Sequence, residues 1–168
     1  MKKGLCMILA VAMSLGLCVS ASAADVASID DSQMVVLEGP VTRAADVPSE
    51  SHSLPYTAST EELQEGTTTL TRYYFTPDGT SFTVSGTVSS SGDKNNQARN
   101  AKLYLYELGS NELISTYEIP QFVGSTSFST TFRNLSSNKN YYFGLKNTTT
   151  RPFPWTQSWW IDAEFTVE

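Results

Sequence analysis

Apolar and polar residues alternate along much of the chain from residue 66 onward. Phe82, Val84 and Val88 alternate with serine and threonine, and similar stretches cover residues 127–132 and 159–167. An alternation with a period of two is typical of a strand that buries one face. Weaker alternation brings the expected number of strands to seven, the further strands being at residues 70–76, 101–108, 113–119 and 141–146.

The segments between these strands are rich in residues that favour turns. Pro77, Asp78 and Gly79 follow the first strand, and residues 134–140 form a polar segment before the sixth. No stretch shows the periodicity of a helix, and the composition favours serine, threonine, tyrosine, phenylalanine and valine, which suit a pleated surface. Short strands at intervals of about 10–15 residues predict an all-β, antiparallel sandwich of two sheets.

The stretch at residues 132–145 carries a more specific signal. Leu135 precedes Tyr141 by six residues, and Phe143 and Leu145 continue the alternation. This stretch resembles the E–F corner of fibronectin type III and related immunoglobulin-like domains. The resemblance implies a tyrosine corner at Leu135 and Tyr141, with a hydroxyl bonded to backbone, and core positions for Phe143 and Leu145. It implies a seven-stranded immunoglobulin-like β-sandwich, with a jelly roll like that of pre-peptidase C-terminal domains as the alternative.

Residues 1–23 have the pattern of a secretory signal peptide of bacterial style. Lys2 and Lys3 precede an apolar run at residues 5–19, and Ala21, Ser22 and Ala23 form a cleavage site. We therefore expect a secreted, extracellular protein with no membrane insertion after cleavage. Both cysteines lie within this segment. The mature chain is thus expected to hold no disulfide, cysteine nucleophile or thiolate metal site.

Charge is distributed unevenly along the sequence, whose formal net charge is −6. Residues 24–65 contain many acids, one arginine, three prolines and few aromatic residues, which predicts an acidic, flexible leader. The β-sandwich domain is then expected at residues 66–168. Within the leader, residues 34–37 are apolar enough to add as an edge strand, and His52 is expected to be solvated. No basic run or patch indicates nucleic acid as a partner.

Catalytic chemistry is poorly represented. Residues 66–168 contain no histidine or cysteine, so no nucleophile with an adjacent imidazole base is available. Asp162 and Glu164 point the same way along the last strand, where they are expected to form a polar outer face rather than a glycosidase pair. The loop around Asp93 is expected to be a turn rather than a calcium site. We therefore expect a protein that is not an enzyme, with no cofactor, metal or catalytic residue.

Aromatic residues are the strongest candidates for binding. In a fibronectin-like topology the third, sixth and seventh strands are neighbours, which would bring Tyr104, Tyr106, Tyr142 and Trp160 together on one exposed face. Such rings offer a large contact area to sugars and proteins at a low entropy cost. The alternatives are cross-strand pairing that stabilises the sheet, or cover by the leader.

The loop at residues 148–157 is the second candidate for a binding segment. It is longer than a connection between neighbouring strands requires, and long loops on rigid sandwiches often carry binding residues. Its candidates are Arg151, Phe153 and Trp155. The alternative is that Phe153 and Trp155 form a lid over the open end of the sandwich.

These observations favour a secreted, non-enzymatic binding or adhesion module. It would recognise extracellular carbohydrate or a protein surface through exposed aromatic residues. One alternative is a structural component of a cell-surface assembly whose leader adds a strand to a neighbour. A remote alternative is a secreted hydrolase.

Overall fold

The computed structural model describes residues 34–37, 47–91, 97–150 and 159–168. The expected signal peptide lies outside these residues. The strands are, in chain order, β1 Val35–Leu37, β2 Glu50–Ser51, β3 Tyr56–Leu63, β4 Thr68–Leu70, β5 Tyr73–Tyr74, β6 Ser81–Ser91, β7 Arg99–Glu107, β8 Leu113–Phe122, β9 Ser125–Arg133, β10 Tyr141–Asn147 and β11 Trp160–Val167. No helix in this part of the chain has the length and apolar character needed to cross a membrane.

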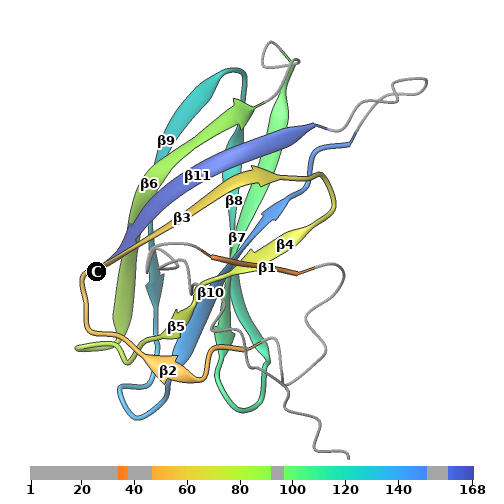
Figure 1. The fold of residues 1–168 in the computed structure, drawn as a ribbon. Helices are drawn as coiled ribbons and strands as arrows, with labels where there is room; N and C mark the ends of the chain where they lie inside the picture. The colour runs from red at the N-terminus through yellow and green to blue at the C-terminus, as the bar shows by residue number, and fades with distance from the viewer. Residues whose placement is uncertain (1–33, 38–46, 92–96, 151–158) are drawn as a thin grey trace, which may run out of the picture.

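Two sheets pack face to face (Figure 1). One sheet has the strand order β1-β4-β10-β7-β8, and the other has the order β3-β11-β6-β9. Strands β2 and β5 form a short parallel pair, whereas the pairs within the two large sheets are antiparallel. The expected all-β, antiparallel sandwich is confirmed.

The pairing of the strands is nested. If β1, β2 and β5 are set aside, the first remaining strand, β3, pairs with the last, β11. Moving inward, β4 pairs with β10, β6 pairs with β9, and β7 pairs with β8. The chain is thus a long antiparallel hairpin that folds over on itself into two sheets, which is the topology of a jelly roll.

The expected immunoglobulin-like strand order is therefore wrong. That order places the last strand beside the sixth, in the sheet that holds the third. Strand β11 lies instead between β3 and β6, in the sheet opposite to β7 and β10. Alternation shows which face of a strand is buried but not which sheet receives the strand. The observed order is that of the alternative expectation, a jelly roll.

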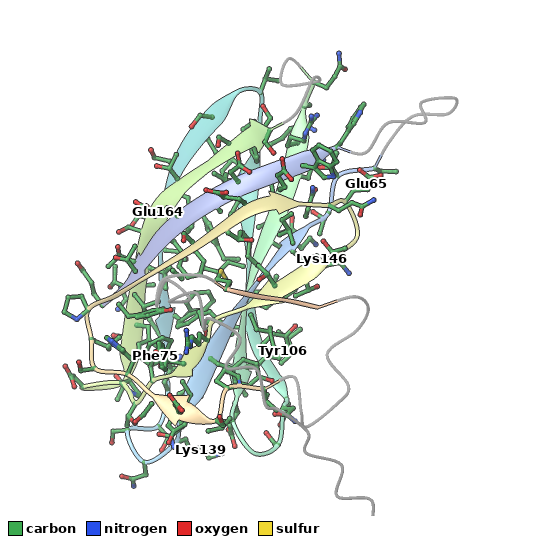
Figure 2. All side chains as sticks on the ribbon, in the orientation of Figure 1. Glu65, Phe75, Tyr106, Lys139, Lys146 and Glu164 are labelled. Atoms are coloured by element: carbon green, nitrogen blue, oxygen red, sulfur yellow. The ribbon has the colours of Figure 1, made fainter. Side chains whose placement is uncertain are left out.

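The inward faces of both sheets form the core, as the alternation predicts. Along β11, the buried residues are Ile161, Ala163, Phe165 and Val167. They share one core with the buried side chains of β7 and β10 in the other sheet. Outward positions on the two sheets point to opposite sides of the molecule, as Glu164 on one sheet and Tyr106 and Lys146 on the other illustrate (Figure 2).

Residues 47–65 belong to the sandwich, so the expected domain boundary at residue 66 is wrong. Strand β3 pairs with β11 along its length, and Tyr56, Ala58 and Leu63 are buried in the core. Met34 is also buried there, and its N–H donates to the Ser59 carbonyl at 2.9 Å. Strand β1 adds to β4, so the apolar residues 34–37 do add as an edge strand. These apolar residues stabilise the N-terminal segment despite its acids and prolines.

His52 is not a solvated linker residue. Its ring centroid lies 4.9 Å from that of Tyr56 and 5.1 Å from that of Tyr73, and its side chain is half-buried. Its backbone N–H donates to the Tyr74 carbonyl at 3.1 Å. These contacts attach the segment that follows β2 to the β5 region.

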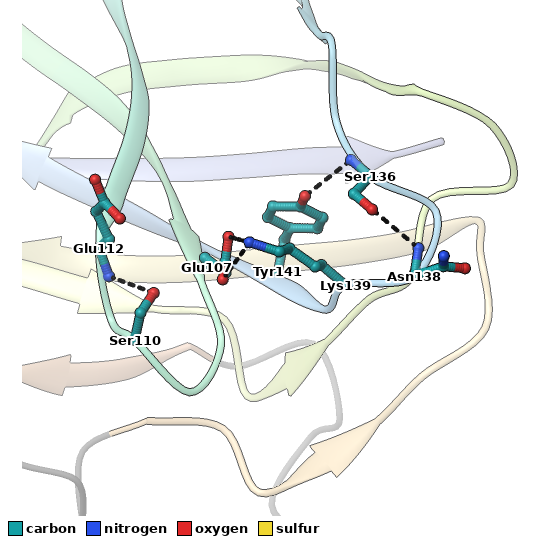
Figure 3. A network of polar contacts seen from close by, with 7 residues as sticks. All are labelled: Glu107, Ser110, Glu112, Ser136, Asn138, Lys139 and Tyr141. Carbon is teal, nitrogen blue, oxygen red and sulfur yellow. Dashed lines mark hydrogen bonds and ion pairs between the residues drawn. The ribbon is translucent and has the colours of Figure 1, made fainter.

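The connection between β9 and β10 forms the expected tyrosine corner (Figure 3). The Tyr141 hydroxyl accepts a hydrogen bond from the backbone N–H of Ser136 at 3.0 Å. Tyr141 is 2% exposed and Leu135 is 5% exposed, and the Tyr141 ring packs edge-on against Phe82. The motif on which the immunoglobulin resemblance rests is therefore present locally, within a different topology.

Candidate functional site

Three of the expected aromatic residues gather on the outer face of the five-stranded sheet. Tyr142 on β10 lies opposite Tyr106 on β7, and their rings stack with centroids 5.2 Å apart. The ring of Tyr104, also on β7, lies 6.0 Å from that of Tyr106. Gly144 leaves room for this packing, because a Cβ at that position would lie 3.2 Å from Cε2 of Tyr106.

Tyr142, however, is not available to a ligand. It is 0% exposed and packs with Leu70. The partly buried side chains that pack against these two residues are Val47, Tyr74, Tyr106 and Leu108. Burial, together with the neighbouring Tyr106, raises the pKa of Tyr142 to about 12. Because Val47 belongs to the expected leader, the alternative in which the leader covers this face is confirmed at Tyr142.

A hollow of about 420 Å³ opens on the same face, beside Tyr104. Asn100, Lys102 and Tyr104 point outward at alternate positions of β7, and Glu118 of β8 lies opposite Lys102. The lining of the hollow consists of Asn100, Ala101, Lys102, Tyr104, Glu118, Ile119 and Thr148. The hollow therefore combines one half-buried ring with an ammonium, a carboxylate, an amide and a hydroxyl.

The polar groups of the hollow are held by short-range contacts. Lys102 Nζ donates to Glu118 Oε1, and this bond is the main cause of the raised pKa of Lys102. The Asn100 carbonyl accepts from the backbone N–H of Thr148 at 2.9 Å, and Gln121 Nε2 donates to Asn100 Oδ1 at 3.4 Å. The side chains that would meet a ligand are thus fixed on two neighbouring strands and the start of the loop that follows β10.

A buried polar network anchors that loop. Asn147 Nδ2 donates to the carbonyls of Leu63 and Trp159, at 2.9 and 2.8 Å, and its Oδ1 accepts from the Thr149 N–H. Thr149 Oγ1 in turn accepts from the Asn100 N–H at 3.0 Å. Satisfying every partner in such a network rigidifies it. This network therefore fixes the position of Thr148 at the edge of the hollow.

Arg99 supports the same end of the sandwich. It is 0% exposed, its guanidinium carbon lies 4.8 Å from the Trp159 ring centroid, and its Nε and Nη1 donate to the carbonyls of Trp160 and Gln97. Burial lowers its pKa, and the charge of Glu65 opposes that shift. The buried position and backbone partners of Arg99 indicate a structural role.

Trp160 is not part of the tyrosine face. It lies on β11 in the other sheet, opposite Ser91, so its predicted proximity to Tyr104 and Tyr142 is wrong. Its predicted outward position beside Asp162 and Glu164 agrees with its partial exposure. The error follows from the wrong assignment of the last strand to a sheet.

A second hollow, of about 300 Å³, lies on the outer face of the four-stranded sheet. Its lining consists of Ser59, Thr60, Glu61, Thr87, Ser89, Asp162, Ala163 and Glu164. Asp162 Oδ1 accepts the backbone N–H of Glu62 at 2.8 Å, so this carboxylate holds β3 to β11. In the described ranges, no group of three or more acids, histidines or cysteines is placed to hold a metal ion.

Arg151, Phe153 and Trp155 lie outside the described residues, as does the loop around Asp93. Of the expected binding loop, Thr148 is the residue seen to line the hollow. Asn100, Lys102 and Glu118 were not among the expected site residues. Alternation along β7 could have placed Lys102 on the same outward face as Tyr104, but the register that brings Glu118 opposite Lys102 has no signal in the sequence.

No known family model matches the chain, and no curated protein sequence matches it. Among solved structures, the VP2 subviral particle of infectious bursal disease virus matches 67% of the chain and 30% of that protein, at 15% identity and a TM-score of 0.41. The chain thus spans about a third of the length of the viral proteins it matches.

Two further matches are carbohydrate-binding modules. CBM36, in complex with calcium and xylotriose, matches 70% of the chain and 93% of that module at 15% identity, with a TM-score of 0.34. The xylan-binding module CBM15 matches 79% of the chain and 96% of that module at 12% identity, with a TM-score of 0.37.

Proposed function

We propose that this protein is a secreted, non-enzymatic module that binds carbohydrate in the hollow beside Tyr104. The observation that carries the proposal is the position of an outward tyrosine ring at the border of a polar hollow of about 420 Å³. A sugar presents an apolar ring face together with hydroxyls at its edge. Tyr104 supplies a flat surface for the ring face, and Asn100, Lys102, Glu118 and Thr148 supply donors and acceptors for the hydroxyls.

The arrangement is also suited to binding because it needs little reorganisation. Tyr104 packs against Tyr106, and Asn100 and Thr148 are joined through the backbone. Groups that are already fixed lose little conformational entropy when a ligand binds. Tyr142 is buried and Trp160 lies on the other sheet, so the site is narrower than an aromatic platform of four rings.

A panel of soluble glycans, screened at millimolar sensitivity with the full chain, tests the proposal. We expect binding to at least one glycan, and a loss of about tenfold in affinity in Tyr104→Ala, the size expected for one stacked ring. Trp160→Ala is the matched control, because Trp160 is an outward aromatic residue on the opposite sheet. A glycan that binds equally well to Tyr104→Ala contradicts the proposed site.

A second candidate function is assembly by strand exchange, which the position of β1 favours. This strand is an edge strand on β4, and Met34 next to it fills a place in the core. The same segment of a second copy would satisfy the same contacts. Size-exclusion chromatography over a range of concentrations tests this: oligomers that vanish on deletion of residues 24–37 support exchange, and a monomer at every concentration contradicts it.

A further inference from the structure

The outer face of the five-stranded sheet holds two lysines side by side. Lys146 on β10 lies directly opposite Lys102 on β7, and both side chains are outward and half-buried. Like charges at directly opposed positions of a sheet repel each other. Lys102 lines the hollow, and Lys146 comes two residues before Thr148, which also lines it. The positive charge is therefore concentrated at the border of the proposed binding site.

The acids of these strands neutralise one lysine of this pair. Strands β4, β7, β8 and β10 contain two acids, Glu107 and Glu118. Glu118 pairs with Lys102, and Glu107 pairs with Lys139 in the turn before β10. Across the described ranges, no acidic group forms an ion pair with Lys146. Within the described residues, Lys146 beside the hollow thus has no acid paired with it.

This local charge is opposite in sign to that of the whole chain, whose formal net charge is −6. A chain with such an excess of acids repels anions at a distance. Any attraction for a ligand with a negative group must therefore come from local contacts. The pair of lysines next to a tyrosine ring supplies such contacts, because ammonium groups form charge-assisted hydrogen bonds with carboxylates and sulfates.

We propose that the ligand of the hollow is an anionic carbohydrate, in which a carboxylate or sulfate group lies between Lys102 and Lys146 while a sugar ring stacks on Tyr104. This inference rests on the proposed function and names its ligand class. The anionic group relieves the repulsion between the two ammonium groups. Glu118 keeps its bond to Lys102 on the β8 side of the pair.

The test uses pairs of polysaccharides that share a backbone and differ in charge. Polygalacturonate is compared with its fully methyl-esterified form, and dextran sulfate with dextran, in calorimetric titrations against the full chain at low ionic strength. We expect the charged member of at least one pair to bind at least tenfold more tightly, and its affinity to fall when salt is added. The two pairs distinguish a carboxylate ligand from a sulfate ligand.

The decisive variant is Lys146→Gln, because it removes a charge without breaking an ion pair. We expect it to weaken binding of the charged polysaccharide about fivefold, the size of one solvent-exposed charge contact, and to leave any binding of the neutral form unchanged. Lys139→Gln is the matched control, since Lys139 is paired with Glu107 away from the hollow.

The outcomes separate the two proposals. If a neutral glycan binds as tightly as its charged partner and binding depends on Tyr104 but not on Lys146, the anionic ligand is wrong and the proposed function stands. If the charged polysaccharide binds equally well to Tyr104→Ala and Lys146→Gln, it binds elsewhere and the inference is overturned. If no glycan in either test binds, the proposed function and the inference both fail.

Discussion

The hydroxyl of Tyr141 accepts a hydrogen bond from the backbone N–H of Ser136, five residues earlier in the chain, at 3.0 Å. In Figure 3 the Tyr141 ring reaches from β10 to the turn that carries Ser136. The ring is buried, so water does not readily replace the hydroxyl as the acceptor for the Ser136 N–H. This bond fixes the path of the chain between β9 and β10, two strands that belong to different sheets.

We expect Tyr141→Phe to lower the free energy of unfolding by about 1–2 kcal/mol, because the Ser136 N–H loses its partner. Urea unfolding followed by circular dichroism measures the change. Tyr142→Phe is the control, since the Tyr142 hydroxyl makes one long contact, 3.4 Å to Asn111 Oδ1. We expect that variant to change stability by less than about 0.5 kcal/mol. Equal losses in the two variants would contradict the role of the corner.

Removal of residues 1–65 is expected to unfold the protein. The truncation deletes β3, the partner of β11, and takes three buried side chains, Tyr56, Ala58 and Leu63, out of the core. Their burial stabilises by about 5 kcal/mol in total, which is comparable to the whole stability of a small domain. A thermal melt of residues 66–168 should lack a cooperative transition. A transition within a few degrees of that of the full chain would show that β3 is dispensable.

Gly86 is expected to tolerate no side chain. It lies on β6 between β9 and β11, and a Cβ there would be 2.3 Å from the Glu164 carbonyl oxygen and 2.5 Å from Phe165 Cβ. Gly86→Ala should therefore destabilise by about 3 kcal/mol, because the strands must separate. Gly79→Ala is the control, because a Cβ at Gly79 meets no atom within 4 Å. Chemical denaturation of both variants measures the effect. Similar stabilities would contradict the close approach of the strands at Gly86.

Stability is expected to decline above pH 10 through the buried Tyr142 and its half-buried neighbour Tyr106. The pKa of Tyr142 is raised to about 12 by burial and then by Tyr106, and burial also raises the pKa of Tyr106. An unfolded tyrosine has a pKa near 10. The folded state therefore holds these protons more tightly, so their contribution is complete below about pH 10 and is lost as the pH rises toward 12.

Unfolding in urea at pH values from 8 to 11.5 measures this decline. Tyr142→Phe removes the ionisable group and keeps most of the ring contacts, so its stability should fall less steeply with pH than that of the unchanged protein. Tyr104→Phe is the control, because Tyr104 is not among the residues that pack against Leu70 and Tyr142. A decline of the same slope in Tyr142→Phe would show that Tyr142 does not carry the effect.

Local features of the fold could be read from the sequence, whereas the pairing of distant strands could not. The inward positions of β11 and the corner at Tyr141 depend on a few neighbouring residues, and both are as expected. The sheet that receives β11 depends on competition among strands across the whole chain. Strand β3 was missed because its acids suggested a flexible segment. Glu61 and Glu62 are exposed on β3, where charges protect an edge strand from unwanted pairing.

The candidate site was predictable in part for the same reason. Alternation along β7 places Tyr104 and Tyr106 outward, and their rings do lie together. The burial of Tyr142 under Val47 depends on a segment almost a hundred residues away. The contact between Lys102 and Glu118 depends on the register of β7 with β8. Such contacts between distant residues depend on the fold, so a single sequence does not reveal them.

The nested pairing of the strands also determines the order in which the chain can fold. The β7–β8 hairpin joins residues about ten apart, such as Leu105 and Ser115, whereas the outermost pair joins Thr57 to Thr166, separated by 109 positions. Closing the larger loops costs more entropy and slows folding. We therefore expect the central hairpin to form first and the ribbon to extend outward. Until β11 has been synthesised, β3 and β6 lack the strand that lies between them, and a ribosome-bound chain exposes unpaired edges that invite aggregation.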